Sequence, residues 1–540
     1  MGFARCGSSW AASAVAEIEA AARGGSFLVS LLLYLRAPVT LEEARATLRR
    51  RLANREADFL RNVGRLVYGH RASPYRRLLR HAGCEYGDLE QLLRKRGLEG
   101  ALATLFRQGV YLTGSELRGD RPVVRGSLRF DLRLRHLRAP WRVIPSPIVG
   151  RRAWPVPQHL AMFQDLAVNA VLTTDARGGA GWRHGHWSSP SDSSVLWLLR
   201  ATGPGYRPVR WFSRFDPAVT PIAFRRRVIA KLVPWLTARA GVPLPPPTPA
   251  PYLAPRPILD WLSEELAAGH TPALSSPVGL AVSLSREARR AGQDLRGAQL
   301  TISAEPATPA RVQEIKAAGL KPVVAYGTRE SGLIAHGCLE PSAADDMHLY
   351  HDAFAVVRVA ASEATAELPA GALLLTGLQP SWPYTLLNVS LGDQATMTRR
   401  DCGCAMGALG WPWHLDTVRS FEKIKVGAAP VPVSAIERLV EEVLPAQCGG
   451  SAIDYQLYEA DDEMVHGQAR LRLLIAPSVG EIDEQRARAL ALAALRRGGA
   501  TTADLEADPD WLTIARRLPV VSAGGKIYHV HRASWSTEPK

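Results

Sequence analysis

Through residues 41–60 apolar side chains fall every three or four positions among many charged ones, which predicts an amphipathic surface helix. Two further helical stretches are expected at residues 73–93 and 98–108. Between residues 123 and 134, apolar and charged positions alternate, and this period predicts a strand pair. The first 150 residues therefore predict a mainly helical region.

From residue 258 onward the pattern alternates between helix and strand. Helices are expected at residues 258–268, 278–291 and 309–318, and strands at 299–303, 322–325, 353–359 and 372–376. Such alternation is typical of α/β layers with partly parallel strands. The proline-rich segment 241–257 forbids a helix or a central strand and predicts a loop within this fold, with a linker between independent domains as the rival interpretation.

After residue 426 the pattern changes again. Ser434 and Glu437 have the spacing of a capping box that would open a helix at residues 436–444. Strands at 454–458 and 471–476, a helix at 484–495 and an apolar segment at 517–521 complete this part. The chain thus predicts an α/β protein in three parts: a helical region (1–150), a core with mixed sheets (151–425) and a small α+β domain (426–540).

The composition indicates a globular protein but does not distinguish between possible functions. The chain has 540 residues, too many for one core, and its 22% charged and 46% hydrophobic residues are typical of globular proteins. The apolar run 26–35 has about half of the roughly 20 residues that a membrane helix needs, so we expect no membrane insertion and a cytoplasmic location. The net charge of +15 suits a polyanion, but no nucleic-acid motif appears, and a solvated arginine-rich surface is favoured over a nucleic-acid groove.

Polar residues suited to a nucleotide follow two expected strands. The turn at residues 303–306 follows one strand, and Tyr326-Gly327-Thr328 with Glu330 follows the next. A tyrosine can stack on a purine, a threonine hydroxyl can donate to a phosphate oxygen, and a glutamate can hold Mg²⁺. Because both runs end strands of an α/β fold, we expect them at a ligand-binding edge, although turns of this kind also occur without a ligand.

Three other segments supply matching chemistry. Asp393 follows a glycine at the end of an apolar stretch and is suited to hold both ribose hydroxyls. The loop 201–208 contributes Thr202, Gly203, Gly205 and Arg207, whose backbone amides and charge suit phosphates. Lys526 follows two glycines near the C-terminus, where a cation between a carboxylate and an α-phosphate would lower the barrier to their reaction.

In these residues the chain resembles the phenylacetate-CoA ligase branch of the adenylate-forming superfamily, which includes acyl-CoA synthetases, adenylation domains and luciferases. The resemblance is strongest from residue 199 to 401. It implies a large adenylate-forming domain with a small mobile C-terminal domain, and it implies ATP, Mg²⁺ and a small carboxylic acid as ligands. It further implies that the loop 201–208 grips the triphosphate, that Ala304, Glu305, Pro306 and Tyr326 line the adenine, and that Lys526 acts during adenylation.

The cysteines suggest a metal site. Cys402 and Cys404 lie one residue apart, and Cys338 and His348 lie upstream, with His351 as an alternative ligand. Three sulfurs and one imidazole suit tetrahedral Zn²⁺, and relatives in the resembled branch carry similar residues at matching places. We therefore expect a structural zinc site.

Three hypotheses follow for the reaction. The first is a ligase that forms an acyl-AMP and passes the acyl group to a thiol, either CoA or the phosphopantetheine of a carrier protein. The second ends in an amide or ester instead, because the hinge at residues 421–427 is shorter than in relatives. The third is a nucleotide-binding relative without turnover, suggested by Pro204 and Tyr206 in the phosphate loop.

The acid itself is not specified by these motifs. Trp182, Trp187 and Trp197, together with His184 and His186, are aromatic material for a pocket, although tryptophans more often belong to a core.

Overall fold

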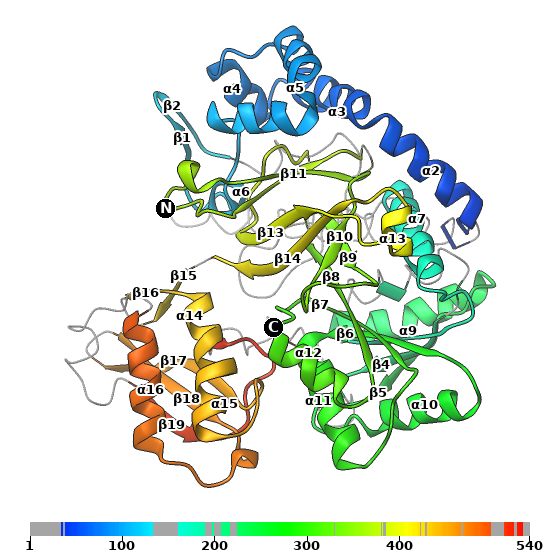
Figure 1. Cartoon of the computed structure of the whole chain (residues 1–540), viewed down its shortest axis with the longest axis vertical. Coiled ribbons are helices and arrows are strands. Elements are labelled where there is room, and N and C mark those ends of the chain that lie inside the picture. The colour runs from blue at the N-terminus through cyan, green and yellow to red at the C-terminus, as the bar shows by residue number, and fades with distance from the viewer. Residues whose placement is uncertain are drawn as a thin grey trace, which may run out of the picture.

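A ten-stranded mixed sheet runs through the middle of the computed structural model (Figure 1). Its strands, in the order in which they lie side by side, are β13 (Asp393–Arg399), β14 (Trp413–Ser420), β10 (Met347–Leu349), β9 (Gly332–Gly337), β8 (Lys321–Thr328), β7 (Gln299–Ser303), β6 (Pro272–Pro277), β3 (Arg183–Trp187), β4 (Pro208–Ser213) and β5 (Pro247–Pro249). The strands from β5 to β8 are parallel, and those from β8 to β13 are antiparallel. The sheet therefore changes from parallel to antiparallel pairing at β8.

The structure describes residues 34–35, 38–132, 160–188, 197–198, 206, 208–215, 224–328, 330–379, 381, 385–421, 423–426, 429–465, 468–497, 512–522 and 526–532. Within these residues no helix has both the length and the apolar content that crossing a membrane requires.

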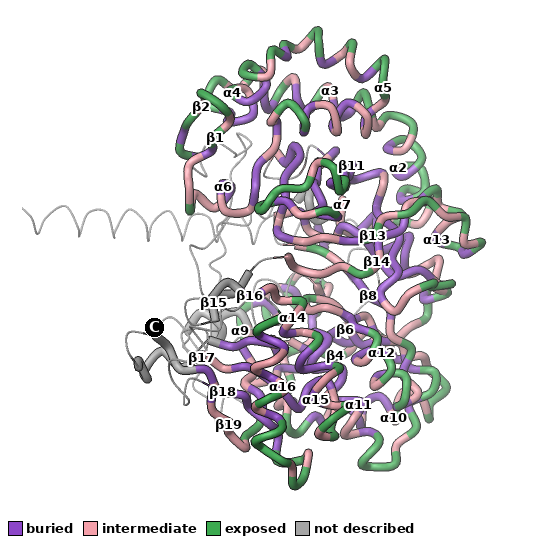
Figure 2. The backbone as a smooth tube through the Cα atoms, turned by 60° about the vertical axis from the view of Figure 1, so that its left-hand side comes forward, coloured by how far each residue is buried: buried purple, intermediate pink, exposed green. Residues whose placement is uncertain are grey.

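Helices pack against the parallel half of the sheet. They are α7 (Leu160–Ala176), α9 (Phe224–Arg239), α10 (Arg256–Ala267), α11 (Val278–Arg290) and α12 (Pro309–Lys316), with the short α13 (Ala405–Ala408) further along the chain. In β7 the buried residues Leu300 and Ile302 alternate with partly exposed neighbours, and α11 turns Ala281, Val282 and Leu284 into the same core. In Figure 2 the strands of the sheet are mostly buried, while the outer turns of helices such as α10 are exposed.

The N-terminal helices pack on a separate small sheet. They comprise α2 (Leu41–Ala53), α3 (Arg55–Val63), a π-helical turn (Gly64–Tyr68), α4 (Pro74–His81), α5 (Tyr86–Arg107) and α6 (Gly114–Arg118), followed by the hairpin of β1 (Val123–Arg125) and β2 (Leu128–Phe130). From α3 onward their apolar faces share one core with β11 (Phe354–Arg358) and β12 (Leu373–Gly377), whereas α2 packs on α7 in the main core. The helical region is thus closed by strands that lie more than 200 residues further along the chain.

Residues 429–532, here called the C-terminal region, have a core of their own. Four strands, in the order β19 (Leu512–Arg516), β18 (Gln468–Ile475), β17 (Tyr455–Val465) and β20 (Val530–Arg532), pack on α14 (Val433–Arg438), a π-helical turn (Leu439–Val443), α15 (Leu444–Cys448) and α16 (Glu484–Arg497). A hairpin of β15 (Lys423–Val426) and β16 (Ala429–Pro432) leads into this region, which lies beside α11 and α12 in Figure 1. The domain boundaries drawn from the sequence stay a prediction.

Several elements match their predicted ranges, and others correct them. The strand at residues 299–303 has the predicted bounds, and the proline-rich segment contributes only the edge strand β5. The predicted capping box is wrong, because α14 begins at Val433 with Pro432 as its N-cap and Ser434 lies inside the helix. The apolar segment 517–521 follows β19, which ends at Arg516.

Candidate active site

Three neighbouring parallel strands bring the predicted turns to one edge of the sheet. Pro277 of β6 lies opposite Ser303 of β7, and Ser303 lies opposite Ala325 of β8. The turn at residues 304–306 and Tyr326 therefore occupy adjacent strand ends, as the sequence predicted. Ligands of α/β folds bind at this kind of edge.

The turn after β7 has an unusual backbone. Ala304 has a φ of 72°, in the left-handed region that residues other than glycine seldom occupy. Among the described residues, the only other non-glycine residues with positive φ are Asn388 and Thr417. Such conformations cost on the order of 1–3 kcal/mol and cluster at ligand sites, so we expect this turn to contact a ligand.

Tyr326 and Asp393 meet across the sheet. The Tyr326 hydroxyl donates a 2.8 Å hydrogen bond to Oδ2 of Asp393, although β8 and β13 are separated by three strands. Burial, with the negative charges of Asp393 and Glu330 added, raises the pKa of Tyr326 well above its usual value. The phenol is therefore a permanent donor, and it fixes the orientation of the carboxylate that we expect to hold the ribose.

Thr328 and Glu330 lie in the tight turn between β8 and β9. At Gly327 a side chain is excluded, because a Cβ would lie 2.4 Å from the carbonyl oxygen of Gly332. The Thr328 hydroxyl accepts from the amide of Ser331 at 3.2 Å and lies 2.8 Å from the Ser331 hydroxyl. Glu330 is partly exposed at the tip of this turn. The backbone is thus closely packed at Gly327, and the predicted roles of Thr328 towards phosphate and of Glu330 towards Mg²⁺ stay predictions.

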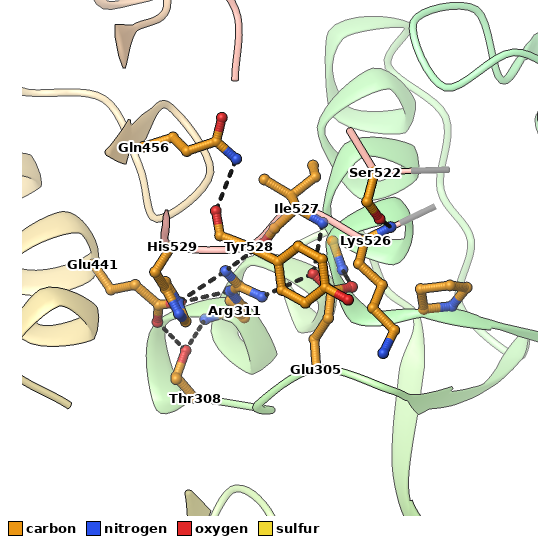
Figure 3. A network of polar contacts seen from close by, with 12 residues as sticks. Glu305, Thr308, Arg311, Glu441, Gln456, Ser522, Lys526, Ile527, Tyr528 and His529 are labelled. Carbon is orange, nitrogen blue, oxygen red and sulfur yellow. Dashed lines mark hydrogen bonds and ion pairs between the residues drawn. The ribbon is translucent and has the colours of Figure 1, made fainter. Parts of the chain in front are cut away.

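Glu305 links three segments of the chain. Its carboxylate accepts hydrogen bonds from the amides of Gly279 at 2.9 Å and Ile527 at 2.8 Å, and it lies 3.5 Å from Arg311 (Figure 3). A Cβ at Gly279 would lie 3.1 Å from both Glu305 and Ile527, so the segments approach closely there. The Glu305 side chain therefore holds the C-terminal region against the strand ends. The predicted contact of Glu305 with the adenine involves this same turn and stays a prediction.

A buried arginine strengthens this link. Arg311 of α12 is 1% exposed, and its Nε lies 2.6 Å from Glu441 of the C-terminal region and its NH2 3.0 Å from Nε2 of His529. Burial alone would raise the pKa of Glu441, but Arg311 and the hydrogen bonds of His529 and Thr308 lower it to about 2. Figure 3 shows these side chains converging between the two parts of the chain. The sequence gave no signal for this contact, because it joins elements far apart in the chain.

Lys526 stands next to this network. Its amide donates to the Ser522 hydroxyl at 3.1 Å, and its carbonyl accepts from the Ser522 amide at 2.9 Å. The ammonium lies 5.6 Å from the centre of the Tyr528 ring. In Figure 3 the Lys526 side chain lies beside Glu305 and points away from Glu441. Since Ile527 is bonded to the turn after β7, the backbone of Lys526 is held at the strand ends where the nucleotide is expected.

The predicted phosphate loop lies largely outside the described residues. Thr202, Gly203, Gly205 and Arg207 are not described, so their predicted contacts with phosphate are neither supported nor opposed. Tyr206 is described, and its ring stacks on His184 of β3 at 5.5 Å between ring centres. His184 lies near the start of β3, so Tyr206 lies at the amino ends of the parallel strands, opposite the edge that carries the residue 304–306 turn.

The four predicted zinc ligands come together where β9, β10 and the connection between β13 and β14 meet. Nε2 of His348 lies 3.2 Å from Sγ of Cys404 and 3.5 Å from Sγ of Cys402, and Sγ of Cys338 lies 3.9 Å from that of Cys404. Burial lowers the pKa of His348 to about 4, so its imidazole is neutral. Its Nδ1 lies 2.7 Å from the carbonyl oxygen of Trp411, which places the proton on Nδ1 and a lone pair on Nε2. Donor types, spacing and tautomer all fit Zn²⁺.

A fifth donor in this cluster was missed by sequence reasoning. Donor atoms of His414, Cys338, His348 and Cys402 all lie within 4.8 Å of one another. Nδ1 of His414 lies 2.7 Å from Asp346, while its buried Nε2 has no hydrogen-bond partner. An imidazole oriented by a carboxylate is a common metal ligand. The alternative ligand His351 instead lies 3.5 Å from Glu99, in another contact.

The fold is similar to that of a solved CoA ligase. In the postadenylation state, in complex with 2-HIB-AMP, 2-hydroxyisobutyryl-CoA ligase superposes with a TM-score of 0.51 at 14% identity, over 91% of this chain and 89% of that chain. This likeness establishes the fold.

Two other solved structures have TM-scores below 0.5 and carry no argument. The same ligase in the thioesterification state gives 0.44 at 14% identity, covering 91% of this chain and 90% of that one. An amide bond synthetase from Marinactinospora thermotolerans gives 0.38 at 16% identity, covering 68% and 65%. No family model matches the sequence, and no curated protein matches it significantly.

Proposed function

We propose that this protein is an ATP-dependent ligase that converts a small carboxylic acid into an acyl-AMP and passes the acyl group to a thiol. One observation carries the proposal. The segment that bears Lys526 is bonded through Ile527 to Glu305, at the end of β7. This contact supports a role for the late lysine beside the strand ends, because α/β folds bind ligands at such an edge.

The residues at this edge of the sheet have different roles in adenylation. Asp393, oriented by Tyr326, holds the ribose hydroxyls, and the residue 304–306 turn contacts the base. Thr328 donates to a phosphate oxygen. Glu330 would hold Mg²⁺, which when bound neutralises charge on the phosphates. These roles follow from donor type and position on neighbouring strand ends.

Lys526 acts on the attack of the substrate carboxylate on the α-phosphorus. That step brings two anions together, and an ammonium between them stabilises the charge that develops in the transition state. The oxygen of the acid forms the new bond to phosphorus, and pyrophosphate leaves with the electrons of the broken P–O bond. A lysine held by docking of a separate region can be withdrawn before the second step.

The acceptor is a thiol, either CoA or the phosphopantetheine of a carrier protein. The thiolate attacks the acyl carbon and AMP leaves. The polar nature of the contact between the two parts of the chain supports such exchange, because Arg286–Asp454 and Arg311–Glu441 are ion pairs that a second arrangement can replace. The order of the motifs and the cysteine cluster favour the phenylacetate-CoA ligase-like branch.

We also propose a structural zinc site in the cysteine cluster. Cys338, His348 and Cys402 would supply three ligands, and Cys404 or His414 the fourth. Burial would raise the pKa of Cys404, but the backbone amides of Gly407, Leu339 and Met406 lower it, which favours the thiolate that binds metal. The site would hold β9, β10 and β14 together and take no part in the reaction.

The proposed reaction is tested by incubating the protein with ATP, Mg²⁺ and a panel of acids, and measuring pyrophosphate release with and without CoA. We expect acid-dependent release, and an acyl-hydroxamate when hydroxylamine replaces the thiol. An amide or ester product formed without any thiol would favour the second hypothesis. Nucleotide binding without pyrophosphate release for any acid would favour the non-catalytic relative and overturn the proposal.

A further inference from the structure

The residue that follows Lys526 is held on three sides. The Ile527 amide donates to Glu305 at 2.8 Å, and the Ile527 carbonyl oxygen lies 3.5 Å from Nη2 of Arg311. The Ile527 side chain is buried, and its Cβ lies 3.1 Å from the place that a Cβ on Gly279 would take. Because consecutive Cα atoms are about 3.8 Å apart, fixing Ile527 also fixes the point from which the Lys526 side chain extends.

Arg311 of α12 holds this segment from the core side. Its guanidinium contacts four groups, and three of them belong to the C-terminal region: Glu441 at 2.6 Å, His529 at 3.0 Å and the Ile527 carbonyl. The fourth is Glu305 at 3.5 Å, in the turn after β7. Figure 3 shows Arg311 between Glu441 and Glu305. One side chain therefore joins the turn after β7, the π-helical turn 439–443 and the segment that bears Lys526.

An arginine suits this position better than a lysine does. The guanidinium is planar and carries five N–H donors, so it can meet several acceptors at once, whereas an ammonium is a compact single charge. The side chains of Arg311 and Glu441 are only 1% and 2% exposed. A pair of charges buried to this degree adds little stability over apolar residues of similar volume. Stability alone therefore does not account for the pair.

A second ion pair between the same two parts of the chain lacks this connection to Lys526. Arg286 of α11 pairs with Asp454 at 2.7 and 2.9 Å, and its side chain is 23% exposed. Within the described residues, Arg286 forms no hydrogen bond or ion pair with residues 526–529. Both arginines contribute to docking, and of the two it is Arg311 that contacts the Lys526 segment.

We propose that Arg311 is a positioning residue for the first half-reaction: it holds the Lys526 segment against the turn after β7, so that the ammonium reaches the reacting carboxylate and the α-phosphate. Arg311 acts through Lys526 and contacts neither the acid nor the nucleotide. The inference rests on the proposed function, which gives Lys526 its part in adenylation. Transfer of the acyl group follows withdrawal of Lys526, so the transfer step does not depend on Arg311.

Arg311 also has a carboxylate on its own side of the contact. When the C-terminal region moves away, Glu441 leaves Arg311, and Glu305 loses the amide of Ile527. Arg311 and Glu305, 3.5 Å apart in the docked arrangement, can then pair more closely. Release therefore leaves no buried cation without a counter-ion, which suits a contact that forms and breaks between the two steps.

The two half-reactions are measured separately in Arg311→Met, with an acid that the panel shows to be active. Pyrophosphate exchange follows adenylation, and thioester formation from the synthetic acyl-AMP and CoA follows transfer. We expect the kcat of exchange to fall about 10- to 100-fold, the range of a charge-assisted hydrogen bond, with the KM for ATP within about 3-fold of the wild type. Thioester formation should stay within about 3-fold. An equal fall of both half-reactions would overturn the inference.

A double-mutant cycle with Lys526→Met shows whether Arg311 acts through the lysine. When Lys526 is already methionine, Arg311→Met should change the rate of exchange by less than about 3-fold, because the group that Arg311 positions is absent. A further fall of about 10-fold or more in the double variant would show that Arg311 acts in another way, and the inference would be wrong.

Two further variants separate positioning from docking and from folding. Arg286→Met removes an ion pair of the same contact and should lower exchange by less than about 3-fold, because Asp454 keeps the hydrogen bonds of Ser451 and Ser478. Arg311→Lys leaves a cation beside Glu441 and so preserves the fold if Arg311→Met does not. Its exchange should lie between those of the wild type and Arg311→Met. Equal losses in Arg286→Met and Arg311→Met, or wild-type exchange in Arg311→Lys, would contradict the inference.

Trypsin cleavage after Lys526 tests the positioning without any reaction. A protease cuts the opened form of a segment, and Ile527 is buried in the docked form, so we expect slow cleavage in the wild type. Appearance of the new N-terminus at Ile527 should be about 10- to 100-fold faster in Arg311→Met and less than about 3-fold faster in Arg286→Met.

The cleavage assay also separates this inference from the proposed function. If the wild type shows no exchange with any acid but cleavage differs between the two variants as expected, adenylation is refuted and the placement of Lys526 by Arg311 stands. Exchange in the wild type, together with equal cleavage rates in Arg311→Met and Arg286→Met, would uphold adenylation and overturn the inference.

Discussion

Replacing Glu441 with glutamine should loosen the docking of the C-terminal region. Glu441 is 2% exposed in its side chain and pairs with Arg311, which is 1% exposed, so solvent screens the pair little. Its pKa falls from 4.5 to about 2, against the effect of burial, because Arg311 and His529 favour the charged form. At 1.36 kcal/mol per pH unit this difference corresponds to about 3 kcal/mol. Docking should therefore weaken about 100-fold.

The pH dependence of this contribution to docking follows from the same two pKa values of Glu441. Because the pKa of Glu441 is lower in the docked state, the contribution is complete above pH of about 4.5 and is lost as the pH falls through about 2. At neutral pH the full effect should be seen in the variant.

Hydrogen exchange of the Ile527 amide reports the docking directly, because this amide donates to Glu305 across the contact. In Glu441→Gln its protection should fall about 100-fold, or to the level of an open segment. The matched control is Glu442→Gln, which removes an exposed ion pair with Arg438 and should change protection by less than about 2-fold. Protection in Glu441→Gln that stays within about 3-fold of the wild type would refute the reasoning.

Two further predictions concern the zinc site and the ribose site. Purified protein should contain about one zinc per chain, and Cys402→Ser should lose the metal and have a lower Tm. The control Cys448→Ser changes a thiol outside the cluster and should keep both the metal and the Tm. A wild-type protein of normal stability without metal would contradict the zinc site. Asp393→Ala should raise the KM for ATP about 10-fold or more and remove the preference for ATP over 2′-deoxy-ATP. Tyr326→Phe should raise the KM less, because the substitution removes only one hydrogen bond to the Asp393 carboxylate. Steady-state kinetics with both nucleotides test this, and an unchanged preference in Asp393→Ala would exclude a ribose contact.

Local patterns in the sequence were enough to place much of the α/β core. The strand at residues 299–303 and the helix at 278–291 were predicted within one residue, because alternation and helical spacing are properties of a short window. The strand and glycine turn at Tyr326 were likewise readable, and the adjacency of the residue 304–306 turn followed from parallel strand order. Motif chemistry at strand ends is therefore accessible from sequence.

Contacts between distant segments were not predictable in this way. The bond between Tyr326 and Asp393 depends on the antiparallel strands that separate β8 from β13, and their order leaves no mark on either segment. The Arg311–Glu441 pair joins two surface helices that look ordinary alone. His414 joined the cysteine cluster because β14 pairs with β10, a register that spacing along the chain does not encode.

At Ser434 the sequence predicted a local motif, a capping box, that does not form. The motif has the right residues at the right spacing, but Pro432 ends the preceding strand β16 and the helix starts directly after it. Tertiary placement of that strand overrode the local preference. Helix starts are therefore less secure than strand cores where a strand and a helix meet without a loop.

The most direct test of the account is pyrophosphate exchange into ATP by the wild type and by Lys526→Met, with the acid panel used above. The account predicts acid-dependent exchange in the wild type and a fall of at least about 100-fold in the variant, with ATP binding and Tm unchanged, because the side chain is partly exposed and acts on the transition state. Exchange at the wild-type rate in Lys526→Met, or no exchange with any acid in the wild type, would contradict it.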